Sequence, residues 1–316
     1  MKTSIVIPVL NDDFIYKCLN FILENFNKKI PKNKQIIVIN DQKSNEIFSQ
    51  KLKAFCKDNK IDYHKSEKPG ASFNRNKGIE LAKGEKIIFI DSDCFPSKKW
   101  LNEMEESLKD FDIVEGKVSY AAKENPLFDR FVENKSTPNR FLTANLGIRK
   151  VVGQKCKFDD RFIVFREDTD FGFCALEKGF TSSFNQKAEV FHKQSRFTIK
   201  KFVLERKRYI GEPLLFKKHK LNPLLKNHVP RIWKFSHPIE LILLFFLVTS
   251  IFMSWKLLIL AYLLPGIIYC SNKYFISKRT FKIKDTLLVL LFLPITMIVK
   301  RIYIWKGSIR FKVLLL

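Results

Sequence analysis

The sequence lacks the glycine-rich motifs by which two large classes of enzymes bind phosphates, because neither GxGxxG nor GxxxxGK[ST] occurs in it. Such motifs place backbone amides against a pyrophosphate, so their absence argues against a dinucleotide-dependent dehydrogenase and against a P-loop enzyme. The six cysteines show neither the paired spacing of a metal site nor a dense disulfide framework. This cysteine usage suits a reducing compartment.

The sequence also lacks the pattern of a secretory signal peptide. Lys2 is the only basic residue before the apolar run at residues 4–10. That run is too short for a signal peptide, and Asn11, Asp12 and Asp13 follow it directly. We therefore expect the catalytic part of the chain to remain in the cytoplasm.

Acidic residues are scarce compared with basic ones, and the formal net charge is +25. Such an excess is typical of nucleic-acid binding. Here, however, residues 193–237 carry 13 Lys or Arg against Glu205 and Glu212, and this basic segment lies beside apolar runs. Basic residues that flank apolar helices typically contact anionic lipids. We predict membrane lipids as partners and no nucleic acid, although a biased nucleotide composition of the genome is an alternative source of part of the charge.

Three uncharged apolar runs occupy residues 241–255, 257–272 and 286–299, and each is shorter than the roughly 20 residues that a membrane-crossing helix needs. Residues 271–285 carry five Lys or Arg against one acid, and residues 300–312 carry five against none. The positive-inside rule places both segments in the cytoplasm. We therefore expect a helical hairpin that turns near Lys256, followed by a re-entrant or interfacial helix.

In the N-terminal part, short β-branched runs alternate with helical patterns. Strands are predicted at residues 4–9, 35–39, 61–64 and 86–90, and helices at 14–26, 45–57 and 71–83, the last with Gly84 as its stop. This alternation predicts an α/β fold with a mostly parallel sheet and helices on both faces. Farther along, strands are expected near residues 113–120 and 190–192, and a helix at 168–178 closed by Gly179.

Ligands of such sheets bind beyond the carboxyl ends of the strands. Polar residues follow three of the predicted strands, namely Asn11, Asp41, and Asp91 with Asp93. Residues two apart on a strand project to the same side, so the last two carboxylates are expected to meet one Mg²⁺ or Mn²⁺. An Asp-rich turn after a strand is also common without any metal, so the triplet alone leaves both interpretations open.

Four segments in order resemble glycosyltransferase family 2, whose members have the nucleotide-diphospho-sugar transferase fold called GT-A. They are SIVIPVLN at residues 4–11, IIVINDQKS at 36–44, GASFNRNKGIELAKGEKIIFIDSD at 70–93 and FDDRFIVFREDTDFG at 158–172. We accordingly expect a GT-A catalytic domain at residues 1–220, a basic linker at 221–238 and a membrane region at 239–316.

The resemblance implies a role for each matching residue of the nucleotide-sugar site. Pro8, Asn11 and Asp41 would line the nucleoside pocket, and Arg75 would help to hold the nucleotide. Asp91 and Asp93 would form the DxD motif, which binds the ribose and the metal diphosphate. The family commonly has two acids and a glycine where this chain has Asn40, Asp41 and Gln42, so the nucleotide of the donor stays open.

The same resemblance implies that Asp168 is the general base and that His192 joins Asp93 at the metal or contacts the diphosphate. Two simpler interpretations remain, because acids favour a helix N-terminus and a lone histidine after a strand is more often structural. Asn145 matches a segment near the acceptor. Arg206 and Arg208 could meet the diphosphate or face lipid.

We therefore predict a metal-dependent, inverting glycosyltransferase that uses Mg²⁺ or Mn²⁺. It would transfer a sugar from a nucleotide-sugar donor to a lipid-linked or growing surface glycan at the cytoplasmic membrane face. One alternative is a polyprenyl-phosphate sugar synthase, although these enzymes usually follow the acidic motif with another signature than the CFPS at residues 94–97. Another is a non-catalytic membrane sugar-binding module, which Asp91, Asp93 and Asp168 argue against.

Overall fold

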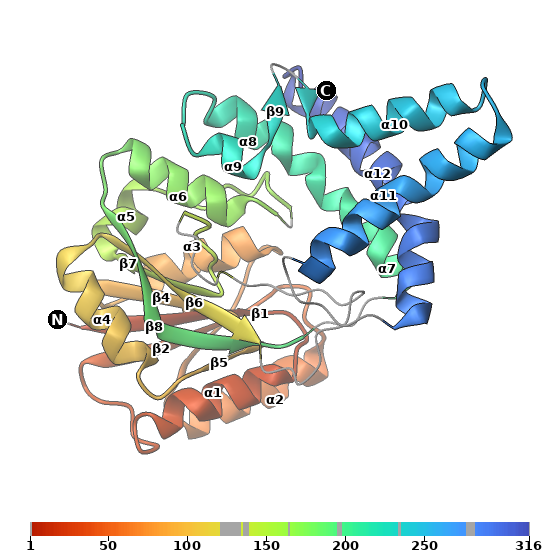
Figure 1. Ribbon diagram of the computed structural model, residues 1–316. Coiled ribbons are helices and arrows are strands. Elements are labelled where there is room, and N and C mark those ends of the chain that lie inside the picture. The colour runs from red at the N-terminus through yellow and green to blue at the C-terminus, as the bar shows by residue number, and fades with distance from the viewer. Residues whose placement is uncertain are drawn as a thin grey trace. The chain divides into compact units, whose positions relative to one another are not determined.

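The computed structural model describes residues 2–120, 134, 139–163, 165–194, 198–232, 235–275 and 282–315. These residues form two compact units, the first extending through Lys193 and the second beginning at Gln194 (Figure 1). Each unit is described by itself.

The first unit is built on an eight-stranded sheet with the strand order β3-β2-β1-β4-β7-β6-β8-β5. Its strands are β1 (Thr3–Val9), β2 (Lys34–Asn40), β3 (Asp62–Lys65), β4 (Lys86–Ile90), β5 (Cys94–Pro96), β6 (Ile113–Tyr120), β7 (Asn145–Arg149) and β8 (Ser182–His192). β1 to β4 are parallel, β7 is antiparallel to β4 and β6, and β5 is antiparallel to β8. The prediction of a mostly parallel sheet is confirmed, with β7 and β5 as exceptions.

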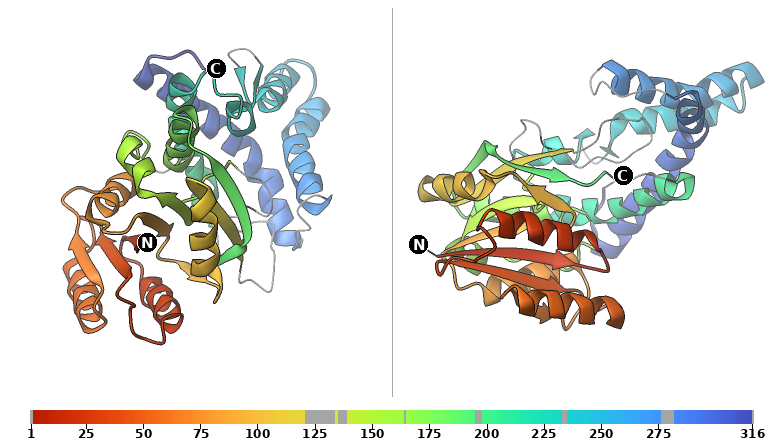
Figure 2. Two further views of the ribbon diagram at one scale, coloured as in Figure 1. Left: turned by 90° about the vertical axis from the view of Figure 1, so that its left-hand side faces the viewer. Right: turned by 90° about the horizontal axis from the view of Figure 1, so that it is seen from below.

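Helices cover both faces of this sheet because successive residues of its strands point in opposite directions (Figures 1 and 2). The helices are α1 (Phe14–Glu24), α2 (Glu46–Asp58), α3 (Ala71–Leu81), α4 (Trp100–Asp110), α5 (Lys150–Lys155) and α6 (Glu167–Glu177). Ile5 and Ile7 of β1 share one core with apolar residues of α1, α2 and α4. Val6, between them, points to α3 and contacts Gly78.

Two local expectations need correction. Gly84 does not end α3, which stops at Leu81 with Ala82 in an extended conformation. Gly84 instead allows a close backbone approach, since a Cβ atom there would lie 2.7 Å from the Ser4 nitrogen. The strand expected at residues 190–192 is the end of the longer β8, and the amphipathic helix α4 was not predicted. Gly179 does follow α6, with φ +83°.

The second unit is mainly helical. It contains α7 (Ile199–Leu204), the 3₁₀ helix η1 (Glu205–Gly211), α8 (Glu212–Lys218), α9 (Leu225–His228), the small strands β9 (Arg231–Ile232) and β10 (Phe235–Ser236), and the helices α10 (Pro238–Ser250), α11 (Trp255–Phe275) and α12 (Ile283–Phe311). α7, η1 and α8 pack on α12. The boundary expected at residue 220 falls inside this unit, which among the described residues begins at Gln194.

Buried polar contacts hold the second unit together. His237 Nε2 lies 2.8 Å from Oε2 of the fully buried Glu212. Lys300 of α12 donates to Glu240 of α10 at 2.8 Å, and Arg301 donates to the Ser236 carbonyl oxygen, also at 2.8 Å. These bonds attach the start of α10 to α8 and α12.

Two helices of this unit, α11 with 21 residues and α12 with 29, are long and apolar enough to cross a membrane. α10 is shorter, with 13 residues, and the turn between α10 and α11 lies just before Lys256. The run at residues 286–299, expected to be a short helix, is the interior of the long α12. Phe245, Phe252 and Trp255 are 71%, 85% and 69% exposed, so the apolar side chains around the turn face outward.

Candidate active site

The loops after β1 and β2 are joined at the carboxyl edge of the sheet. Asn11 accepts a hydrogen bond from the Asn45 amide at 2.9 Å. Asp41 is buried, and its Oδ2 accepts bonds from the Gly70 amide at 2.7 Å and from Asn74 Nδ2 at 2.8 Å. Asp41 therefore organises the start of α3. Pro8, on β1, is half-buried at the same edge.

Arg75 of α3 connects two of the predicted motifs. Its NH2 group lies 3.1 Å from Asp91 Oδ1, and its NH1 group lies 3.2 Å from Glu167 Oε1. The guanidinium also lies over the ring of Phe158, 5.7 Å from its centroid. Arg75 is buried, and its Nε has no hydrogen-bond partner among the described residues. The guanidinium of Arg75 thus connects α3 with the turn at Asp91 and with the segment from Phe158 to Glu167.

Asp91, Ser92 and Asp93 form a turn between β4 and β5, closed by a bond of 3.1 Å from the Cys94 amide to the Asp91 carbonyl. The expectation that they continue a strand is wrong, because the chain turns directly after Ile90. The two carboxylates consequently contact different partners. Asp91 pairs with Arg75, whereas Oδ1 of Asp93 lies 3.5 Å from Nε2 of His192.

Asp93, Cys94 and His192 form the candidate metal centre, with their ligand atoms within 4.8 Å of one another. The pairing of β5 with β8 sets Cys94 opposite His192. Nδ1 of His192 lies 2.8 Å from the Lys193 carbonyl oxygen. A carbonyl only accepts, so Nδ1 donates this hydrogen bond and Nε2 is the ring nitrogen that faces Asp93.

The electrostatics of this cluster suit a cation. Burial raises the pKa of Asp93, His192 opposes that rise, and the nearby Asp91 and Asp12 add to it. Burial also raises the pKa of the Cys94 thiol, which therefore stays neutral. A carboxylate oxygen and an imidazole nitrogen are donors that fit Mn²⁺, or Mg²⁺ with water and phosphate oxygens completing its shell.

Asp168 lies in the first turn of α6, directly after Glu167. Burial, together with the charge of Glu167, raises the pKa of Asp168 to about 7, while Arg75 opposes the rise. Its Oδ1 accepts a bond from the Thr169 amide at 2.7 Å. A carboxyl group with a pKa near neutrality is well suited to accept a proton from a hydroxyl group.

Other predicted residues lie elsewhere. Asn145 is fully buried and bonds Trp100 Nε1 and the carbonyls of Lys117 and Ala188 at 2.7, 2.9 and 2.7 Å. It therefore supports the β6–β8 pairing, and its expected place near the acceptor stays a prediction. Arg206 and Arg208 belong to η1 in the second unit, where Arg208 pairs with Glu205 at 2.9 Å.

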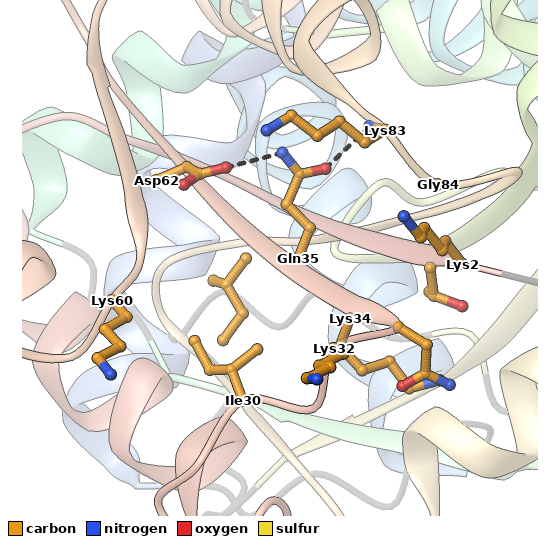
Figure 3. A pocket seen from close by; sticks show the side chains of 12 residues that line it. Lys2, Ile30, Lys32, Lys34, Gln35, Lys60, Asp62, Lys83 and Gly84 are labelled. Atoms are coloured by element: carbon orange, nitrogen blue, oxygen red, sulfur yellow. Dashed lines mark hydrogen bonds between the residues drawn. The ribbon is translucent and has the colours of Figure 1, made fainter.

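A cavity of about 240 Å³ lies at the opposite, amino ends of the strands (Figure 3). It is lined by five lysines, Lys2, Lys32, Lys34, Lys60 and Lys83, and by one acid, Asp62. None of the predicted site residues lines it.

Sequence reasoning missed two residues. No metal-binding role was predicted for Cys94 in the CFPS segment. Cys94 lies near His192 because β5 pairs with β8, and no local spacing reveals that pairing. Glu115, a buried carboxylate in β6, gave no signal except its charge within an apolar strand.

Residues 4–158 match the family model described as Glycosyl transferase family 2, and residues 86–299 match the one described as Glycosyl transferase family group 2. Glycosyltransferase AglE of Haloferax volcanii is 29% identical over 163 residues, which cover 47% of this chain and 53% of AglE. The poly(ribitol-phosphate) beta-glucosyltransferase of Bacillus spizizenii is 35% identical over 123 residues, 36% of this chain and 19% of that protein. The match thus spans about half of the first relative and a fifth of the second.

Among solved structures, GalNAc-T7 with UDP, GalNAc and Mn²⁺ superposes with a TM-score of 0.51 at 15% identity. The superposition covers 62% of this chain and 43% of that chain, and it shows a shared GT-A fold. With two matching family models, one of which extends over more than half of the sequence, the chain belongs to glycosyltransferase family 2.

Proposed function

We propose that this glycosyltransferase moves a sugar from a nucleoside-diphosphate donor to an acceptor hydroxyl group in a single, inverting displacement. The observation that carries the proposal is the Arg75 bridge, with N–O distances of 3.1 Å to Asp91 and 3.2 Å to Glu167. It holds the turn that contains Asp93 near the helix that contains Asp168. Arg75 thereby supports both the proposed metal ligand, Asp93, and the proposed general base, Asp168.

The donor would bind along the carboxyl edge of the sheet. Pro8, Asn11 and Asp41 would surround the nucleoside, and Asp91 would contact the ribose. Asp93 and His192 would hold a divalent cation, Mn²⁺ or Mg²⁺. When bound there, the cation would neutralise negative charge on the nucleoside-diphosphate leaving group.

Asp168 would act as the general base. As the acceptor oxygen attacks, Asp168 takes its proton, a bond forms between that oxygen and the anomeric carbon, and the bond to the diphosphate oxygen breaks. Attack from the side opposite the leaving group inverts the anomeric centre. The raised pKa of Asp168, about 7, lets the group hold the transferred proton near neutral pH.

The acceptor would be a lipid-linked or growing surface glycan at the cytoplasmic membrane face. Support comes from α11 and α12, which are long enough to cross a bilayer, and from the basic residues that flank them. In this proposal residues 239–316 attach the enzyme to the membrane as a multi-pass region. The relative whose name specifies a poly(ribitol-phosphate) substrate supports a polymeric acceptor.

The test is the binding of a panel of nucleotide sugars to the full chain in detergent, with and without Mn²⁺. We expect one donor to bind more tightly with Mn²⁺, and that gain to disappear in Asp93→Asn. The control is Asp110→Asn, since Asp110 is exposed at the end of α4. If Asp93→Asn kept the whole gain, Asp93 would not be a metal ligand.

A further inference from the structure

Glu115 on β6 is a buried carboxylate to which the proposed reaction assigns no role. Its Oε1 accepts a hydrogen bond from the Asn139 amide at 2.5 Å. Its Oε2 accepts bonds from the amides of Arg140 at 3.0 Å and Phe141 at 2.6 Å. Three successive backbone N–H groups thus converge on one side chain, which is 1% exposed. The backbone of residues 139–141 therefore curves toward this carboxylate and donates all three of its amides to it.

The backbone of that segment has an unfavourable conformation. Asn139 has φ +72° and Phe141 has φ +53°, in the left-handed region that side chains rarely adopt. Asparagine tolerates this region, whereas an aromatic residue does not do so readily. Such strain persists where surrounding contacts impose it. The bonds to Glu115 are among the contacts that hold Phe141 in place.

The Phe141 ring in turn supports α6. The ring is fully buried, and a Cβ atom on Gly172 would lie 2.1 Å from it. Phe141 therefore fills the space that a side chain at position 172 would take. It also meets the ring of Phe173 edge-on, with centroids 6.5 Å apart. Both contacts lie in the second turn of α6.

Gly172 is four residues after Asp168, and residues four apart lie one above the other on the same side of a helix. Phe141 consequently packs one turn below the carboxylate that we propose as the base. A chain of contacts leads from Glu115 through the backbone and ring of Phe141 to the helix that carries Asp168. All of these residues belong to the first unit.

We propose that Glu115 is a positioning residue, which sets the place of Asp168 by fixing Phe141 against α6. The inference rests on the proposed role of Asp168. Glu115 touches neither donor nor acceptor in this scheme. Its removal should therefore lower the rate of transfer without weakening donor binding, since a reacting group displaced by about 1 Å can cost roughly a hundredfold in rate.

The experiment compares two variants with a matched control by amide hydrogen exchange and by kinetics. Glu115→Gln keeps the size of the side chain but points an NH₂ group at backbone N–H groups. Phe141→Leu removes the ring while leaving the backbone amides in place. The control is Glu189→Gln, since the carboxylate of Glu189 on the neighbouring β8 bonds the side chains of Lys117 and Ser119.

In Glu115→Gln we expect faster amide exchange at residues 139–141 and in the first two turns of α6, with unchanged exchange in β1 to β4. Transfer should slow by about ten- to a hundredfold, with the donor dissociation constant within a few-fold of wild type. Phe141→Leu should loosen α6 and slow transfer to a similar extent. Glu189→Gln should change neither quantity.

Three results would overturn the proposal. The first is faster exchange at 139–141 with unchanged exchange in α6, which would confine Glu115 to the loop. The second is a loss of donor affinity as large as the loss of rate, which would place Glu115 in the donor site. The third is wild-type kinetics in Phe141→Leu. If the wild-type enzyme transferred no sugar, the proposed function would fail, while the exchange data would still decide whether Glu115 is coupled to α6.

Discussion

Asp91 and Asp93 lie in one turn, but their carboxylates contact different partners. Asp91 belongs to an arginine cluster with Arg75 and Glu167, in which the protein itself supplies the cation. Asp93 belongs to a histidine cluster with Cys94 and His192, in which its partners are a thiol and an imidazole. The comparison teaches that Asp91 is paired with a buried arginine of the protein, whereas Asp93, which we propose as the metal ligand, lies beside an imidazole.

The largest effect should come from removing the charge of the histidine cluster. Asp93→Asn should abolish measurable transfer and the dependence of donor binding on Mn²⁺, because a neutral amide is a poor ligand for a hard divalent cation. Calorimetric titration with donor, with and without Mn²⁺, measures the binding, and a transfer assay measures the rate. If Asp91→Asn abolished the Mn²⁺ dependence while Asp93→Asn retained it, the assignment of the two clusters would be reversed.

Asp168→Asn should have the next largest effect. It keeps the size of the side chain but removes its basicity, so transfer should slow by roughly a hundred- to ten-thousandfold. Donor binding should stay within a few-fold of wild type, since the donor contacts are assigned to other residues. Single-turnover kinetics and equilibrium binding separate the two quantities. Abolished donor binding would move Asp168 into the nucleotide site, with Asp170 and Glu167 as the next candidates for the base.

Arg75→Gln tests whether the arginine cluster is a framework. It leaves Asp91 and Glu167 without their cation, and breaking a buried ion pair typically costs about 3 to 5 kcal/mol. Because the Asp91 side chain keeps 29% exposure, we expect about 3 kcal/mol, at the lower end of that range. Chemical denaturation measures the free energy of unfolding, and Arg161→Gln, which removes a guanidinium that is 55% exposed in its pair with Asp159, serves as the control. A loss equal to that of the control would mean that the bridge contributes little.

The smallest effect concerns pH. The pKa of Asp168 is raised to about 7 by burial, so the base is protonated below that pH. Transfer should fall by about tenfold per pH unit on acidification below pH 7, the limit for one required deprotonation. Because the pKa of Asp168 is higher in the folded than in the unfolded state, the folded state binds the proton more tightly. The contribution of Asp168 to the free energy of unfolding is therefore lost as pH rises, not as it falls. A pH profile of turnover beside a pH profile of unfolding distinguishes the two trends.

Much of the parallel half of the sheet could be predicted from the sequence, because its signals are local. The β-branched apolar run at residues 4–9 and the period near four at Ile15, Cys18, Leu19 and Ile22 are properties of single elements. Asn11, Asp41, Asp91 and Asp93 were found likewise, since each follows a predicted strand. The roles of Arg75, Asp168 and His192 were predicted from the family resemblance. The elements β5, α4 and β7 were not predicted, and they lie between the family segments that end at residue 93 and begin at residue 158.

The sequence by itself determined the α/β architecture, the family and the carboxylates at the carboxyl edge, because strand and helix periods and the motifs are contained in short segments. Only the tertiary structure decided which partner each of those carboxylates contacts. The turn after Ile90 sends Asp91 to Arg75 and Asp93 to His192, and the latter partner is brought close by the pairing of β5 with β8. Contacts between residues about a hundred positions apart depend on sheet order and chain reversal, which no local pattern encodes.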